Sequence, residues 1–139
     1  MISQSELFTH YSFIPSALAT LGESGEQMLP DTTVHLLRLY VSQINGCQYC
    51  QIMHTDALQN SVPAEQFDLL LSALSSSDLS LLSAFDQAVL QLANAVTKSL
   101  PCDLAAKSQQ PLTQAQQLAV VGLALQINSW NRVAIGFNF

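Results

Sequence analysis

Apolar residues recur every three or four positions along much of the chain, which is the period of an amphipathic helix. The most regular run comprises Leu82, Phe85, Val89, Leu92 and Val96. On a helix this spacing gathers the apolar side chains on one face, where they can pack against a core. We therefore expect the longest and most regular helix of the chain in this segment.

Prolines, glycines and capping residues divide the rest of the sequence into further helices. Residues 1–14 carry aromatic side chains without a clean period and predict an arm that packs onto another part of the molecule. We expect helices from Pro15 to Gly22 or Gly25, from Pro30 to Gly46, from Cys47 to about Asn60, and from Ala64 to Leu74. A further short helical stretch is expected between Leu100 and Thr113.

The run from Leu118 to Leu125 is apolar on every side, so periodicity alone fits either a buried strand or a central helix. It has few β-branched residues and follows Thr113, a good helix cap, which favours the central helix. With the other segments it predicts an all-α fold of about six helices. At 139 residues and 49% hydrophobic content, we expect residues 1–139 to form a single domain.

The charge of the chain argues against two classes of partner. The formal net charge is −6, and the four basic residues, Arg38, Lys98, Lys107 and Arg132, are spread without a cluster. Nucleic acid and anionic membranes are poor partners, because both bind concentrated positive charge. Charged residues make up only 10% of the chain, so we expect part of its surface to be buried in a homo-oligomer.

No segment reaches the roughly 18 apolar residues that cross a bilayer, and residues 1–6 lack the pattern of a signal peptide. We therefore expect a soluble, cytoplasmic protein. In a reducing compartment, the C-x-x-C spacing of Cys47 and Cys50 indicates redox chemistry or metal binding. Cys102 stands alone beside a proline, and we interpret it as an incidental thiol.

Cys47, Cys50 and His54 are the candidate chemical groups. On a helix that turns about 100° per residue, their side chains point to one side, against an apolar stripe. Gly46 allows a tight turn before the helix, whose unpaired N–H groups favour a thiolate near its start. By this argument Cys47 is the more acidic thiol. His54 could accept the thiol proton as a base or stabilise the thiolate as an imidazolium.

Two motifs carry a resemblance to a known family. Residues 41–50, VSQINGCQYC, together with Met53-His54-Thr55, resemble the core motif of alkylhydroperoxidase D. Residues 127–132, INSWNR, resemble the ending that is common in the same branch. The chain thus resembles the alkylhydroperoxidase D-like (AhpD-like) branch of the carboxymuconolactone decarboxylase family, least clearly over residues 61–112.

The resemblance implies an all-helical fold, a trimer or hexamer, and a thiol-dependent, peroxiredoxin-like antioxidant enzyme. Its substrates would be hydrogen peroxide or small organic hydroperoxides. In that scheme Cys50 attacks the peroxide, Cys47 resolves the sulfenate as a disulfide, and His54 belongs to the proton relay. A lipoylated or other dithiol protein would reduce the pair again, and no cofactor or metal is expected.

The resemblance and the helix-terminus argument disagree about which cysteine is the more acidic. We assign the attacking role to Cys50, as the resemblance implies. His54 lies one helical turn beyond Cys50, and direct proton transfer to it can outweigh a helix-dipole effect of about 1 kcal/mol.

His35 departs from the pattern of the family, because the relay of the family has a glutamate twelve residues before the first cysteine. A carboxylate is thereby replaced by a group whose ordinary pKa is near neutrality. Two outcomes stay open: a relay rewired through His35, or weak or absent peroxidase activity.

Two alternatives belong to other functional classes. His35, Cys47, Cys50 and His54 are the ligand types of a tetrahedral zinc site, which would make the protein a non-enzymatic assembly module. A decarboxylase or isomerase of the same family would act on small cyclic acids and needs no cysteine pair. Arg38 and Arg132 are the arginines that could hold such a carboxylate, and we expect Trp130 in the core or a subunit interface.

Overall fold

The computed structural model describes residues 1–102 and 111–139, and the regular elements within these ranges are all helical. The α-helices are α1 (Gln4–His10), α2 (Phe13–Met28), α3 (Asp31–Asn45), α4 (Gln48–Ser61), α5 (Ala64–Ser76), α6 (Ala84–Lys98) and α7 (Gln114–Phe137). A 3₁₀ turn, Leu79–Leu81, connects α5 to α6. The expected all-α fold is confirmed, with seven α-helices among the described residues where about six were predicted.

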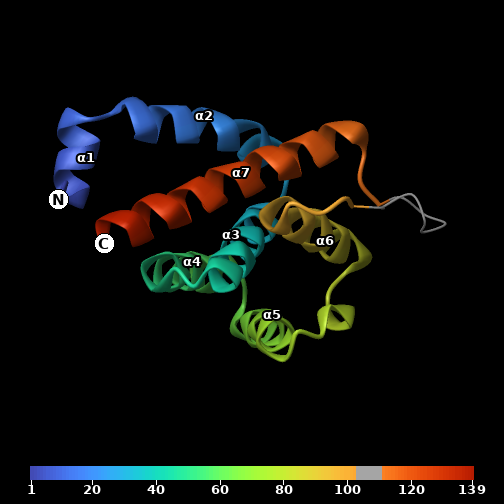
Figure 1. Ribbon diagram of the computed structural model, residues 1–139. Coiled ribbons are helices and arrows are strands. Elements are labelled where there is room, and N and C mark those ends of the chain that lie inside the picture. The colour runs from blue at the N-terminus through green and yellow to red at the C-terminus, as the bar shows by residue number, and fades with distance from the viewer. Residues whose placement is uncertain (103–110) are drawn as a thin grey trace.

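Helix α7 runs through the middle of the molecule and contacts α2, α3, α4 and α6. Figure 1 shows α2 along one side of α7, with α3, α4 and α6 on the other side and α5 farthest from α2. The two ends of the chain lie on the same side of the molecule (Figure 1). The contacts of α4 with α3 and α7 hold the cysteine segment beside the central helix.

The main core is formed by leucine, valine, isoleucine and alanine side chains from α3 to α7. Val89 and Leu90 of α6 and Val120 and Leu123 of α7 are fully buried in it. The periodic segment after Leu82 is therefore a core-facing helix, as predicted. It is not the longest, however, because α7 has 24 residues and α6 has 15. Since α7 is covered on several sides, its length is not marked by an amphipathic period.

The apolar run from Leu118 to Leu125 is the central helix that the sequence favours over a strand. Thr113 caps this helix as predicted. Its hydroxyl accepts a hydrogen bond from the Gln116 N–H at 3.2 Å, while Thr113 N–H donates to the Gln116 side chain at 2.9 Å. This reciprocal pair satisfies N–H groups that have no partner inside the helix. No helix among the described residues has the length and apolar character that a membrane span requires.

The predicted arm over residues 1–14 does pack an aromatic side chain onto another part of the molecule, because Phe8 stacks on Trp130 of α7. The prediction that this arm is irregular is wrong. Ser3 and Glu6 form a capping box that starts α1, and α2 already begins at Phe13. The aromatic side chains hide the helical period here, because Phe8, Tyr11 and Phe13 are exposed and do not form one buried face.

The predicted end of the second helix at Gly22 or Gly25 is also wrong, because α2 continues to Met28. Both glycines are buried against α7. A Cβ atom on Gly25 would lie 2.2 Å from Leu123 Cγ, and one on Gly22 would lie 2.2 Å from the Gln126 amide nitrogen. These glycines therefore allow close packing of two helices rather than helix termination.

The remaining predicted boundaries agree with the structure within one or two residues. Helix α3 begins after Pro30 and ends before Gly46, and α5 extends from Ala64 to Ser76. Helix α4 begins at Gln48, one residue later than predicted, with Cys47 as its N-cap. The short helical stretch predicted between Leu100 and Thr113 falls largely on residues 103–110, outside the described residues.

The packing of α7 predicts a contrast between two of its own glycines. A Cβ atom on Gly122 would lie 2.5 Å from the Leu21 carbonyl oxygen, which is backbone and cannot move without shifting α2. We expect Gly122→Ala to lower the free energy of unfolding by roughly 1–3 kcal/mol in urea unfolding. Gly136→Ala is the matched control, since nothing lies within 4 Å of its Cβ position. Gly136→Ala should leave the free energy of unfolding unchanged or raise it slightly. Equal losses of stability in the two variants would contradict the close packing of Gly122 on α2.

Candidate active site

A glycine turn between α3 and α4 positions the cysteine pair. Gly46 adopts a left-handed conformation, with φ of 68°, that side chains rarely allow. The Gly46 N–H donates to the Gln43 carbonyl at 3.2 Å, and the Cys47 N–H donates to the Ser42 carbonyl at 3.0 Å. These bonds close the last turn of α3 and bring Cys47 to the start of α4. The predicted helix stop at Gly46 is confirmed.

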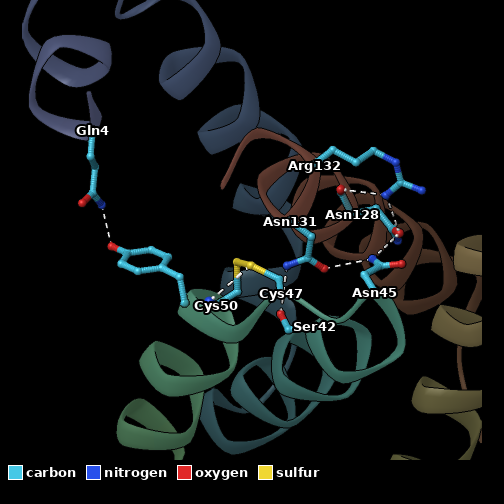
Figure 2. Close-up of a disulfide and its surroundings, with 9 residues drawn as sticks. Gln4, Ser42, Asn45, Cys47, Cys50, Asn128, Asn131 and Arg132 are labelled. Carbon is cyan, nitrogen blue, oxygen red and sulfur yellow. Dashed lines mark hydrogen bonds between the residues drawn. A yellow bond between two sulfur atoms is a disulfide. The ribbon is translucent and has the colours of Figure 1, made fainter. Parts of the chain in front are cut away.

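Cys47 and Cys50 are joined by a disulfide, with their Cα atoms 5.3 Å apart. The Cys47 sulfur also accepts a hydrogen bond from the Cys50 N–H at 3.3 Å, an N–H group of the first turn of α4 (Figure 2). The residues are only 1% and 2% exposed, respectively. The pair is thus bonded, held at a helix N-terminus and largely shielded from water.

The inner face of α4 carries Cys50, His54 and Leu58, which are buried at a spacing of four residues. The sequence predicts Cys47, Cys50 and His54 on one face of the helix; the structure confirms this for Cys50 and His54, whereas Cys47 lies before the first residue of α4. Cys47, as the N-cap, contacts Cys50 from just outside the helix. His54 is 8% exposed, so its imidazole ring is enclosed with the sulfur of Cys50.

His35 and His54 lie side by side, with ring centroids 6.4 Å apart and the planes tilted by 31°. Among the described residues, neither Nδ1 atom has a hydrogen-bond partner. Burial, followed by the positive charge of Arg38 and then by His35, lowers the pKa of His54 from 6.5 to about 3. Burial and Arg38 also lower the pKa of His35, while Asp31 and Glu26 oppose the shift. Both rings are therefore neutral at pH 7 in the disulfide form.

A cavity of about 160 Å³ opens beside Cys50 and His54. Its walls are mainly aromatic and apolar, contributed by Phe8, Tyr49, Met53, Ile127, Trp130, Ala134 and Phe139. Its polar lining consists of Gln4, Arg38, Gln126 and the His54 ring. A space of this character suits a small molecule with an apolar body.

Trp130 both packs against the main core and lines this cavity. Its ring stacks on Phe8 of α1, with centroids 5.6 Å apart and an angle of 11° between the planes. Gln4 of α1 donates a hydrogen bond to the Tyr49 hydroxyl (Figure 2). Helix α1 therefore closes one side of the cavity. Sequence reasoning missed Phe8, Tyr49 and Gln126; for Tyr49, its place between the two cysteines was a usable signal.

A chain of side-chain amides ties the end of α3 to α7 (Figure 2). Asn131 is fully buried; its Nδ2 donates to Ser42 Oγ at 3.0 Å, and its Oδ1 accepts from Asn45 at 2.9 Å. Asn45 also donates to Asn128, which in turn accepts hydrogen bonds from Arg132. The INSWNR segment thus supports the turn that holds Cys47.

The four residues of the zinc alternative do not gather as ligands. Among the described residues, no group of three or more His, Cys, Asp or Glu side chains is arranged to hold a metal ion. The two sulfurs are bonded to each other, and His35 lies behind His54. Cys102 lies apart from the pair and packs against the main core. In the disulfide form the four residues of the zinc alternative are therefore not arranged as one ligand set.

The sequence model of the carboxymuconolactone decarboxylase family matches residues 15–89, more than half of the chain. This match includes most of α2, all of α3, α4 and α5, and the cysteine pair. The chain belongs to the carboxymuconolactone decarboxylase family. This family member is 28% identical over 139 residues to the uncharacterized protein YdfG of Bacillus subtilis (strain 168), covering 94% of this chain and 93% of that protein.

The fold of this family member also resembles a crystal structure from Agrobacterium tumefaciens. That protein is of unknown function and is described as a candidate antioxidant defence protein AhpD. The TM-score is 0.76 at 22% sequence identity, and the match covers 99% of this chain and 94% of that one. The family model thus shows the family, and this structural likeness shows that the two proteins share a fold.

Burial of His54 predicts that this family member loses stability in acid. The pKa of His54 is about 3 in the folded protein and 6.5 when solvated, so the unfolded chain binds the extra proton between these values. Stability must therefore fall as the pH falls below about 6.5. For the disulfide form, we expect His54→Gln to remove roughly 2 kcal/mol of the loss between pH 7 and pH 4.5.

The measurement is urea unfolding of the parent protein and the variant at both pH values. Carboxylates contribute to acid unfolding in both proteins. Subtracting the stability that the variant loses between pH 7 and pH 4.5 from the stability that the parent loses therefore gives the contribution of His54. Parallel losses would mean that His54 is not held in the neutral form.

Proposed function

We propose that the protein is a thiol-dependent peroxidase that reduces hydrogen peroxide or small organic hydroperoxides. The observation that carries this proposal is the buried Cys47–Cys50 disulfide with His54 one turn away, at the wall of an apolar cavity. A pair of cysteines within bonding distance can alternate between the dithiol and the disulfide by thiol–disulfide exchange. Membership of the family and the AhpD-like fold are consistent with a role in antioxidant defence.

The cycle starts from the dithiol. The Cys50 thiolate attacks the terminal oxygen of R–O–O–H, the O–O bond breaks, and Cys50 becomes a sulfenic acid while the product leaves as R–OH. The Cys47 thiol then attacks the Cys50 sulfur, which forms the S–S bond and releases water. A dithiol protein, such as one that carries a lipoyl group, restores the pair with two electrons and two protons.

The cavity supports the assignment of the attacking role to Cys50. Cys50 lines the apolar cavity together with His54, whereas Cys47 borders a different hollow with Gly46 and Asn138. A peroxide in the apolar cavity would meet the sulfur of Cys50 first. Cys47 is already within bonding distance of Cys50 and is suited to resolve the sulfenate.

His54 is placed to move the protons of this cycle. It is enclosed with Cys50, and its neutral ring can accept the thiol proton and return it to the departing alkoxide. A thiolate at Cys50 would raise the pKa of the ring above its value in the disulfide form. His35 lies beside His54, so a charged residue at this position would change the electrostatic field at the His54 ring.

The direct test is peroxide consumption with an excess of a small dithiol reductant. We expect Cys50→Ser to lower the rate about 100-fold or more, because the two remaining thiols, Cys47 and Cys102, do not line the cavity beside His54. Without added reductant, Cys47→Ser should consume one equivalent of peroxide and then stall as the sulfenic acid of Cys50, which a dimedone adduct would detect by mass spectrometry. Cys102→Ser is the control and should match the parent protein. Equal rates for Cys50→Ser and the parent would refute the proposed function.

The identity of residue 35 gives a second test. A carboxylate beside His54 would raise the pKa of the imidazole instead of lowering it, which makes the ring a stronger base near pH 7. We expect His35→Glu to increase the rate of peroxide consumption about tenfold. His35→Gln, which adds no charge, is the control and should not show this gain. If both variants match the parent, the charge at position 35 does not govern the relay.

A further inference from the structure

The cavity beside Cys50 contains one permanently charged side chain. Its lining includes no aspartate or glutamate, and His54 is neutral in the disulfide form. Arg38, from the middle of α3, lines the same cavity. Because the walls are mainly apolar and the Arg38 side chain is nearly buried, its charge is screened less than that of a surface residue.

Arg38 is held in this position by two partners. Its Nη2 donates to the carboxylate of Glu26 and to Gln126 Oε1, the latter at 2.6 Å. Gln126 is itself fixed, because its amide nitrogen donates to the Leu18 carbonyl at 2.9 Å. The missing side chain of Gly22 leaves the space that the Gln126 amide occupies. Residues of α2 and α7 therefore fix the position of the Arg38 guanidinium.

The neutralisation of Arg38 by Glu26 is incomplete. The Arg38 side chain is only 12% exposed, whereas that of Glu26 is 51% exposed and shares its charge with water. Both observed hydrogen bonds use Nη2, and the Nε and Nη1 groups donate to no described residue. One edge of a nearly buried cation is thus left for an anion.

We propose that Arg38 is the cation that stabilises the Cys50 thiolate once the disulfide has been reduced. The inference rests on the proposed function and deepens it by assigning the source of positive charge. The same field acts on both histidines, since Arg38 opposes the protonation of His35 and of His54. A positive field that disfavours an imidazolium favours a thiolate.

The other charged and titratable groups near the site do not supply this charge. Glu26 from α2 and Asp31 from α3 are anionic and act against Arg38 in their effect on His35. His35 and His54 are neutral, and Gln126 from α7 carries no charge. In this arrangement His54 carries the proton only between the Cys50 thiol and the departing alkoxide, while the lasting positive charge beside Cys50 is that of Arg38.

The test measures the pKa of the Cys50 thiol in a Cys47→Ser, Cys102→Ser background, where one cysteine remains. The ultraviolet absorbance of the thiolate is followed as a function of pH. We expect Arg38→Gln to raise the pKa of Cys50 by about one unit, and Arg38→Lys to retain most of the parent behaviour. Lys98→Gln removes an exposed cation that does not line the cavity and should have no effect.

A second variant, Glu26→Gln, tests the inference even if Arg38→Gln does not fold. Glu26→Gln changes an exposed residue and releases Arg38 from its counter-ion, so it should shift the pKa of Cys50 in the opposite direction, downward. His54→Gln should leave the pKa of Cys50 close to that of the parent. An unchanged pKa in both folded Arg38→Gln and Glu26→Gln would overturn the inference, as would a rise in His54→Gln equal to that in Arg38→Gln.

This measurement needs no peroxide, so it separates the inference from the proposed function. A shifted thiol pKa in a protein that consumes no peroxide would keep the role of Arg38 and refute the peroxidase. Peroxide consumption that depends on Cys50, together with a Cys50 pKa that does not change in Arg38→Gln, would keep the peroxidase and refute the role of Arg38.

Discussion

The site depends on one buried amide, that of Asn131. A buried amide without partners costs roughly 1–3 kcal/mol, and Asn131 finds its partners only when Ser42 and Asn45 of α3 reach it. These two residues lie immediately before Gly46 and Cys47. The need to satisfy Asn131 therefore fixes the end of α3 against α7. The left-handed turn at Gly46 then places the disulfide beside the same helix.

Exclusion of water is the second constraint on the site. The tight packing of α2 on α7 and the stacking of Phe8 on Trp130 enclose Cys50 and His54. In that environment a charged side chain is costly unless it has hydrogen-bond or ion-pair partners. His54 therefore stays neutral in the disulfide form, whereas Arg38 keeps its charge through its partners Glu26 and Gln126. The histidine at position 35 fits this balance, because a carboxylate there would add a negative charge beside the imidazole of His54 and oppose the field of Arg38. The electrostatics of this chain thus differ from those of a relay built on glutamate.

Local signals and long-range packing give different information about the helices. Gly46 ends a helix because its backbone conformation is local, and the sequence shows this correctly. Gly22 and Gly25 look similar in sequence, yet both lie inside α2, because the residues that crowd them belong to α7. The helical content of residues 1–14 was missed for a related reason. The partners of their aromatic side chains, such as Trp130, are more than a hundred positions away.

The sequence by itself determined the all-helical class, the cysteine helix with its glycine turn, and the common face of Cys50 and His54. Each of these follows from spacing and backbone preference within a few residues. Only the tertiary structure decided what surrounds that face. It brought His35 beside His54, placed Phe8, Trp130 and Gln126 around one cavity, and turned Arg38 toward it. Burial and electrostatic fields are properties of neighbours in space, so no pattern along the chain could reveal that this site holds one cation and two neutral histidines.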